Sequence, residues 1–228
     1  MNQLPLFDLN GDIGRGAVGE AAFPNARAQL DHMDYLGIER SLVTHIQSRE
    51  LNPIVGNRTL LDTLAALPAS AGRLVPVFTI NAATGYERGA VDFLKRHMAD
   101  GTTRALATFP DTCRHPLSHL EPLLEKLAPF RPMLLWNTME NPHGELDYRD
   151  FMALAAKCPD IAFVAGKKMW PGFGSVLDAM RRCSNVYVDI SWLHMRRTIE
   201  LLTRQFGADR VLFGTGCRTH YGAAIAAL

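Results

Sequence analysis

The chain has 228 residues, of which 47% are hydrophobic and 21% are charged, and its formal net charge at pH 7 is +1. This composition is typical of a globular protein with one substantial core, and the absence of a basic block argues against nucleic acid or an anionic membrane as a partner. No apolar run approaches the ~20 residues that a membrane span needs, and the first residues lack the pattern of a secretory signal peptide. The four cysteines are scattered without metal-type spacing, so we expect reduced thiols in a cytoplasmic protein.

Short apolar runs alternate with segments of helical periodicity along the whole chain. The apolar runs predict strands at residues 4–9, 40–46, 73–81, 103–110, 132–138, 161–166, 185–191 and 210–216. Apolar residues at helical spacing predict helices between them, at residues 26–37, 57–67, 91–98, 117–127, 148–155, 176–180 and 195–206. Such alternation predicts parallel strands joined by right-handed crossovers.

Eight strand–helix units in one chain of this length predict a single (β/α)₈ TIM barrel, an α/β fold, over residues 1–228. A doubly wound open sheet is the rival architecture, but the glycines of G-D-I-G-R-G at residues 11–16 lack the spacing of a dinucleotide-binding fingerprint. Only residues 217–228 follow the eighth predicted strand, so we expect a shortened final helix of about two turns. Apolar surface left uncovered beside it would favour a homo-oligomer or a frayed end.

Polar side chains leave the first predicted strand at Asp8, Asn10 and Asp12, and their spacing of two puts them on one face. The carboxyl ends of barrel strands are where such folds carry their chemistry. This stretch resembles the start of the amidohydrolase-related family of metal-dependent hydrolases and decarboxylases. Further resemblance lies in M-D-Y-L-G-I-E-R-S-L-V-T-H, V-G-N-R-T-L-L-D-T-L and F-G-A-D-R-V-L-F-G-T-G. The resemblance implies a TIM barrel that hydrolyses or decarboxylates small carboxylates, lactones or cyclic amides.

The metal-binding pattern of that family is not kept. The family places two histidines on the first strand, one near the end of a middle strand, one after the sixth-strand glycine, and an aspartate at the end of the eighth strand. The corresponding residues of this chain are Asn10, Asp12, Trp136 or Asn137, Lys167 and Gly216. Because catalytic zinc takes about three protein ligands, we expect no metal and no cofactor.

Two charged residues are the candidates for a catalytic role. Asp12 leaves the first strand, and Lys167 stands where the family has a metal ligand after the sixth strand. A lysine there could balance a carboxylate, bind an anionic substrate or form a Schiff base. We expect the Lys167 ammonium to lie within about 4 Å of the Asp12 carboxylate, directly or through one water, because two buried charges are less costly when paired.

Other residues are candidates for binding a small anionic molecule at the barrel mouth. Arg15 and Arg218 flank the first and eighth strand ends, and two solvated arginines are the alternative. His45 could face the mouth or the helix layer, and His220 could line the mouth or cap the last helix. The complete set of predicted substrate-binding residues is Asn10, Arg15, His45, Trp136, Arg218 and His220.

Three hypotheses of function follow. The first is a metal-free amidohydrolase-like barrel that binds, and slowly converts, a small anionic molecule. The second is a pseudoenzyme whose inactive site serves binding or assembly. The third is a lyase that forms a Schiff base through Lys167. Trapping of a lysine adduct would separate the third hypothesis from the other two.

Overall fold

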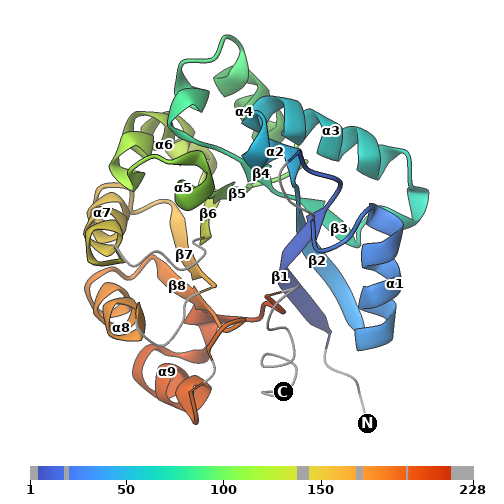
Figure 1. The fold of residues 1–228 in the computed structure, drawn as a ribbon. Coiled ribbons are helices and arrows are strands. Elements are labelled where there is room, and N and C mark those ends of the chain that lie inside the picture. The colour runs from blue at the N-terminus through green and yellow to red at the C-terminus, as the bar shows by residue number, and fades with distance from the viewer. Residues whose placement is uncertain (1–4, 18–20, 138–143, 168–171, 194, 217–228) are drawn as a thin grey trace.

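The computed structural model describes residues 5–17, 21–137, 144–167, 172–193 and 195–216. Within these ranges a ring of strands is surrounded by helices (Figure 1). The strands are β1 (Leu6–Ile13), β2 (Ile38–His45), β3 (Leu74–Pro76), β4 (Phe78–Thr79), β5 (Ala105–Thr108), β6 (Met133–Asn137), β7 (Ala162–Gly166), β8 (Val186–Asp189) and β9 (Val211–Leu212). They form two parallel sheets, ordered β1-β2-β3 and β4-β5-β6-β7-β8-β9.

The two sheets are continuous because β3 and β4 are parts of one strand. Only Val77 separates them, and its backbone N–H still donates to the Val43 carbonyl oxygen at 2.8 Å. Pro76 has no N–H to give, which explains a break at this point in a predicted strand. With β3 and β4 counted together the ring has eight parallel strands, as the sequence predicted.

The junction between β9 and β1 has the fewest backbone hydrogen bonds of the described ring. The described parts of these two strands show no strand pairing, and the backbone bond found between them runs from Leu9 N to Phe213 O at 3.2 Å. The predicted strand at residues 210–216 is shortened to Val211–Leu212. Side chains described below provide the remaining links across this junction.

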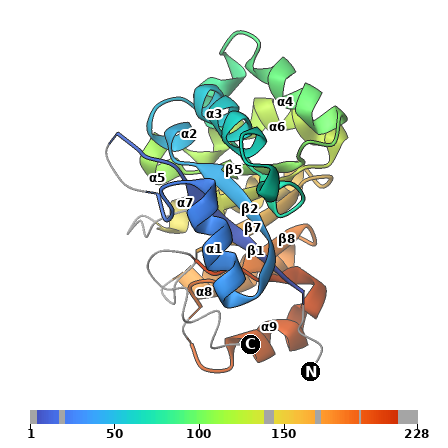
Figure 2. The same ribbon diagram turned by 90° about the vertical axis from the view of Figure 1, so that its right-hand side faces the viewer.

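Helices follow the strands and lie outside them. They are α1 (Ala26–Leu36), α2 (Gln47–Glu50), α3 (Pro53–Ala65), α4 (Ala90–Ala99), α5 (Pro110–Cys113), α6 (Glu121–Leu127), α7 (Gly144–Lys157), α8 (Phe173–Arg182) and α9 (Thr198–Phe206). Figure 2 shows α1 lying along the outer side of β1 and β2. The Asn25 side chain caps its start, and Gly37, at φ 71°, ends it as predicted. No helix among the described residues is long and apolar enough to cross a bilayer.

Side chains alternate between two apolar layers along each strand. Small and medium residues such as Ala107, Leu135 and Val164 fill the inside of the barrel. Larger residues, including Phe78 and Phe163, point outward and pack under the helices. This alternation is the period of two that a pleated strand imposes. The fold therefore has a filled interior, and polar chemistry is confined to the strand ends.

Trp136 belongs to the outer layer. Its ring is 1% exposed and packs against Tyr148 and Phe151 of α7, with ring centroids 4.9 and 4.6 Å apart. Because Leu135 faces inward, the next residue must face outward. This placement differs from the mouth-facing position that the sequence analysis assigned to Trp136, and the inward residue at the end of β6 is Asn137.

The segment V-G-N-R, part of the family resemblance, attaches α3 to the barrel. Asn57 is fully buried; its Nδ2 donates to Thr79 O at 3.0 Å and its Oδ1 accepts from Thr79 N at 2.9 Å. The Asn57 side chain thus makes the two hydrogen bonds to the backbone of Thr79 that a neighbouring strand would make beside β4. Gly56 passes so close to the Ser48 backbone that a Cβ would collide with it.

Replacing Asn57 tests this attachment. Asn57→Ala should lower the free energy of unfolding by about 2–4 kcal/mol, because it leaves a buried N–H and a buried carbonyl without partners. Urea unfolding measures the change. Thr59→Ala, at a partly exposed position of the same helix, is the control and should cost well under half as much. Equal losses in the two variants would contradict the assigned role.

Candidate functional site

Three buried carboxylates lie at the C-terminal end of the barrel. Asp8 and Asp12 come from β1 and Asp189 from β8, and their exposed fractions are 4%, 8% and 0%. The pairing of β1 with β2 shifts between Asp8 and Gly11. The uninterrupted alternation predicted for residues 8, 10 and 12 is therefore broken, although all three side chains are buried. Each carboxylate has a different set of partners.

Asp8 binds the segment that follows β9. Its Oδ1 accepts from Thr215 N at 2.7 Å and its Oδ2 from Thr215 Oγ1 at 2.9 Å, and Asn10 N donates to Oδ1 at 3.1 Å. Burial raises the pKa of Asp8 from 3.8 to about 6 against the opposing effect of these hydrogen bonds, and the nearby Asp189 charge adds to the rise. Asp8 thus links β1 to the end of the chain's last strand.

Asp189 accepts four hydrogen bonds. Its Oδ2 accepts from Asn10 Nδ2 at 2.9 Å, Ser191 Oγ at 2.8 Å and Lys167 N at 3.3 Å, and its Oδ1 accepts from Ser191 N at 2.8 Å. The position of Gly214 has no room for a Cβ beside Asn10 and Asp189. Asp189 therefore joins β1, β8 and the residue after β7. Asp189 and Ser191 therefore hold neighbouring elements together.

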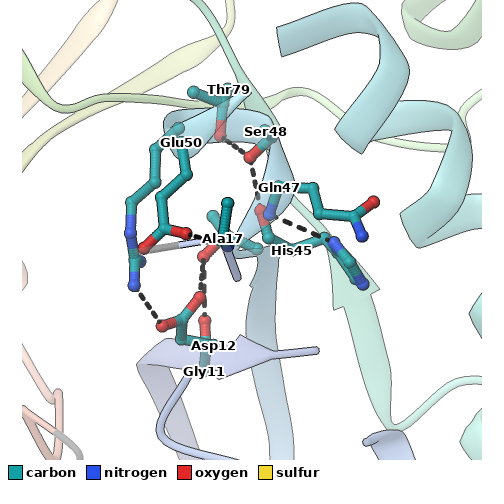
Figure 3. Close-up of polar contacts among 10 residues, drawn as sticks. Gly11, Asp12, Ala17, His45, Gln47, Ser48, Glu50 and Thr79 are labelled. Carbon is teal, nitrogen blue, oxygen red and sulfur yellow. Dashed lines mark hydrogen bonds and ion pairs between the residues drawn. The ribbon is translucent and has the colours of Figure 1, made fainter. Parts of the chain in front are cut away.

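Asp12 forms an ion pair with Arg49 of α2, with Arg49 Nη2 2.8 Å from Asp12 Oδ2 (Figure 3). Thr44 Oγ1 lies 3.3 Å from both the Gly11 carbonyl oxygen and Asp12 Oδ1. The Arg49 guanidinium also lies over the Phe109 ring, 5.3 Å from its centroid. A cation therefore neutralises Asp12, but it comes from the second βα loop.

Lys167 does not form the predicted direct pair with Asp12. Within the described part of the chain no carboxylate lies within ion-pair distance of its ammonium. Its backbone is left-handed, with φ 53°, and its N–H is bound by Asp189. Burial lowers the pKa of Lys167 and the charge of Arg49 lowers it further, whereas Asp12, Asp189 and Asp8 act in the opposite direction. The direct pair is not formed because Arg49 already satisfies Asp12, and a link through one water stays a prediction.

Two amide oxygens at the same end have no hydrogen-bond partner among the described residues. They are Asn10 Oδ1 and Asn137 Oδ1, and the residues are 5% and 9% exposed. Asn137 Oδ1 lies against Gly166, where a Cβ would come within 2.6 Å of it. A buried acceptor without a donor is costly. Each of these two oxygens therefore lacks the donor that a buried acceptor needs.

The remaining predicted residues are more peripheral. Arg15 is exposed and has no ion pair with any residue that the structure describes. This position agrees with the alternative interpretation, in which Arg15 is a solvated surface residue. The His45 ring packs on Gly14, accepts from Gln47 N at 3.3 Å, and points away from Asp12 in Figure 3. Burial lowers the pKa of His45. Arg218 and His220 lie outside the described residues.

Sequence reasoning missed Arg49, which follows β2 in Q-S-R-E. The one available signal was that Arg49 follows His45, at the end of a predicted strand, by four residues. Residues that closely follow a barrel strand commonly lie at the mouth of the barrel. Asn137 was considered only as an unusual metal ligand. Its inward direction depends on the register of β6, which the sequence did not fix.

The described residues do not fit a divalent metal ion. No group of three or more His, Cys, Asp or Glu side chains in the described ranges could hold one. Asn10 Nδ2 is a donor to Asp189, Asp12 is bound by a guanidinium, and Lys167 brings a positive charge. A metal needs acceptors that are not already committed to protein donors. We derive no chemical step through a metal.

The shifted pKa of Asp8 predicts a pH dependence of stability. The pKa of Asp8 is about 6 in the folded protein, above the ordinary value of 3.8. The stabilisation that the protonated Asp8 carboxyl contributes to folding is therefore complete below about pH 4 and is lost as the pH rises through 6. Relative to Asp8→Asn, the wild type should lose about 3 kcal/mol of unfolding free energy between these limits. Urea unfolding across the pH range measures this. Asp92→Asn, at an exposed position of α4, should change nothing; an unchanged slope in Asp8→Asn would refute the assignment.

The Arg49–Asp12 pair predicts a measurable coupling energy. The two side chains are 18% and 12% exposed, so a double-mutant cycle with Arg49→Met and Asp12→Asn should give about 1–2 kcal/mol, less than for a fully buried pair. The control cycle uses the exposed Arg181–Asp178 pair of α8, for which about 0.5 kcal/mol or less is expected. Indistinguishable couplings would show that water screens the Arg49 pair.

Comparison with known proteins agrees with this architecture. The model of the amidohydrolase family matches residues 64–217. The 5-carboxyvanillate decarboxylase LigW from Sphingomonas paucimobilis superposes with a TM-score of 0.71 at 12% identity, covering 99% of this chain and 92% of that chain. An uncharacterised TIM-barrel protein from Bordetella bronchiseptica gives 0.64 at 19% identity, covering 89% and 73%.

A third similar structure is the 4-oxalomesaconate hydratase LigJ from Rhodopseudomonas palustris, with a TM-score of 0.64 at 13% identity, covering 94% of this chain and 82% of that chain. At such identities the likeness establishes the TIM-barrel fold alone. No protein of curated function matches the sequence. The family match covers more than half of the residues and agrees with the resemblance seen in the motifs. The chain belongs to the amidohydrolase family.

Proposed function

We propose that this protein binds a small carboxylate at the C-terminal end of its barrel, through the ammonium group of Lys167 and without the metal ion of its family. The observation that carries the proposal is the environment of Lys167. Its side chain is partly buried among charged groups, yet no described carboxylate forms an ion pair with it. Its backbone is held in a conformation that costs a non-glycine residue about 1 kcal/mol or more.

The electrostatics favour an anion at this position. A partly buried ammonium that has no partner among the described residues is destabilised by desolvation, and an incoming carboxylate would reduce that cost. The carboxylates already present are committed elsewhere, Asp12 to Arg49 and Asp189 to four donors. A ligand carboxylate would therefore form the charge-assisted hydrogen bond that Lys167 lacks.

The two unpartnered amide oxygens suggest a second feature of the ligand. Asn10 Oδ1 and Asn137 Oδ1 accept hydrogen bonds, so a ligand bearing a hydroxyl or N–H group near its carboxylate would satisfy them. Two structurally similar enzymes have names that refer to carboxylate compounds, 5-carboxyvanillate and 4-oxalomesaconate. This supports a small hydroxylated or unsaturated carboxylate as the class of ligand. Binding alone, in an inactive barrel, would need no further group.

A second candidate function is Schiff-base chemistry by Lys167, and the lowered pKa of this residue favours it. The neutral amine would attack the carbonyl carbon of a keto acid, loss of one water would leave an imine, and uptake of one proton from solvent would give the protonated imine. The nearby carboxylates could stabilise that positive charge. A lysine that only binds an anion forms no such covalent bond, so the two functions are separable by experiment.

The binding proposal predicts a response to pH. Because the empty site disfavours the charged form of Lys167, binding of a carboxylate should be linked to proton uptake, and affinity should fall as the pH rises. Calorimetry with hydroxybenzoates and small dicarboxylates, in buffers of different ionisation enthalpy, measures the uptake. Lys167→Met should reduce affinity by roughly tenfold or more.

Lys157→Met is the matched control, since Lys157 is exposed on α7 and pairs with Glu121. It should bind the same carboxylates as the wild type. Borohydride treatment in the presence of keto acids distinguishes the second candidate, because a reduced adduct on Lys167 changes the mass of the peptide that contains it. Binding that survives Lys167→Met unchanged would reject the first function, and the absence of a reduced adduct on Lys167 would reject the second.

A further inference from the structure

Arginine recurs at the N-terminal ends of the strands, opposite the site described above. Arg40 lies near the start of β2, and four others lie within two residues before a strand: Arg73, Arg104, Arg131 and Arg210. Because all strands are parallel, these five residues lie at one end of the barrel. Residues at this end of a TIM barrel usually stabilise the fold and take no part in catalysis.

Three of the five arginines have structural contacts. Arg73 pairs with Asp34 at 2.7 Å and donates to the carbonyl oxygens of Ile38 and Glu39. Arg210 donates to three carbonyl oxygens around the start of β8, those of Met180, Cys183 and Val186. The third, Arg40, lies over the Phe7 ring. These side chains close gaps between a strand and its neighbour.

Arg104 and Arg131 make no such contacts. Both are exposed, and neither guanidinium has a hydrogen bond or ion pair with any residue in the described ranges. They precede adjacent strands, since β5 pairs with β6, and Met133 N donates to Arg104 O at 2.8 Å. Arg131 is held in a left-handed conformation, with φ 50°. Two guanidinium groups are thus brought to neighbouring strand starts without an internal partner.

These two arginines line one pocket of about 380 Å³, which also contains Asp160, Asn185 and Tyr187. The Asn185 amide is occupied, because it donates to the carbonyl oxygens of Ala155, Cys158 and Ile161. The ring of Tyr187 packs against the inner core. The groups that remain for a ligand are two guanidinium donors, the Tyr187 hydroxyl and one carboxylate. The pocket therefore carries a net charge of about +1 at neutral pH.

We propose that this pocket binds a phosphate-type dianion, either inorganic phosphate or the phosphate group of a small monoester. Neighbouring strands lie about 4.8 Å apart, so two guanidinium groups at their starts can contact one tetrahedral anion from two sides. Planar guanidinium donors suit phosphate oxygens better than a single ammonium does. A bound anion would also connect the starts of β5 to β8, since the pocket is lined from all four.

Calorimetry and thermal unfolding with inorganic phosphate test this site at constant ionic strength, with chloride as the reference salt. Phosphate should bind saturably and raise the melting temperature. Arg104→Met combined with Arg131→Met should weaken binding roughly tenfold or more, and its melting temperature without phosphate should match that of the wild type. Arg88→Met, at an exposed position outside the pocket, should bind phosphate normally.

Glycerol phosphate distinguishes the two ligand sources, because a site for monoesters should bind it at least as tightly as inorganic phosphate. Lys167→Met separates this site from the carboxylate site and should leave phosphate binding unchanged. The proposal is overturned if phosphate has no saturable effect, if the double variant binds it normally, or if Lys167→Met abolishes the response.

Discussion

The structure depends on how three buried carboxylates are satisfied at the C-terminal end of the barrel, and two of them, Asp8 and Asp189, join β1 to the last strands of the ring. Between β9 and β1 the described backbone contributes one hydrogen bond, and side chains supply the rest. Asp8 holds Thr215 by two bonds, and Asn10 reaches across to Asp189. Each bond to a buried charge is worth about 1.5–3 kcal/mol, and a missing donor would cost at least as much. The polar residues of β1 therefore complete the ring before they serve any ligand.

This requirement explains the distribution of charge at the mouth. Asp8 and Asp189 are committed to neutral donors, which leaves Asp12 as the carboxylate that needs a cation. Arg49 reaches it from α2, and its planar group also covers Phe109, a contact that a lysine would make less well. With Asp12 paired to Arg49, no described carboxylate lies within ion-pair distance of the Lys167 ammonium.

The sequence predicted the fold better than the site, for a physical reason. Alternating apolar runs report the burial of whole strands, so they revealed eight parallel units, and Gly37 correctly marked the end of α1. Pairing between side chains depends on the register and on the course of loops, which local patterns do not contain. The partner of Asp12 was therefore assigned to Lys167, although the short helix after β2 brings Arg49 closer. Trp136 was placed at the mouth because its one-residue alternation with Leu135 was not taken into account.

The same argument accounts for the polar residues at the end of β1. The amide group of Asn10 bonds Asp189, and Gly214 leaves the space that this contact requires. Thr215, before the closing position, is bound to Asp8 by both its backbone and its hydroxyl. These contacts need hydrogen-bond donors where a metal site needs acceptors. Because Asn10 and Thr215 serve to close the barrel, a metal ion bound by these residues would need another way of joining β1 to the end of the ring.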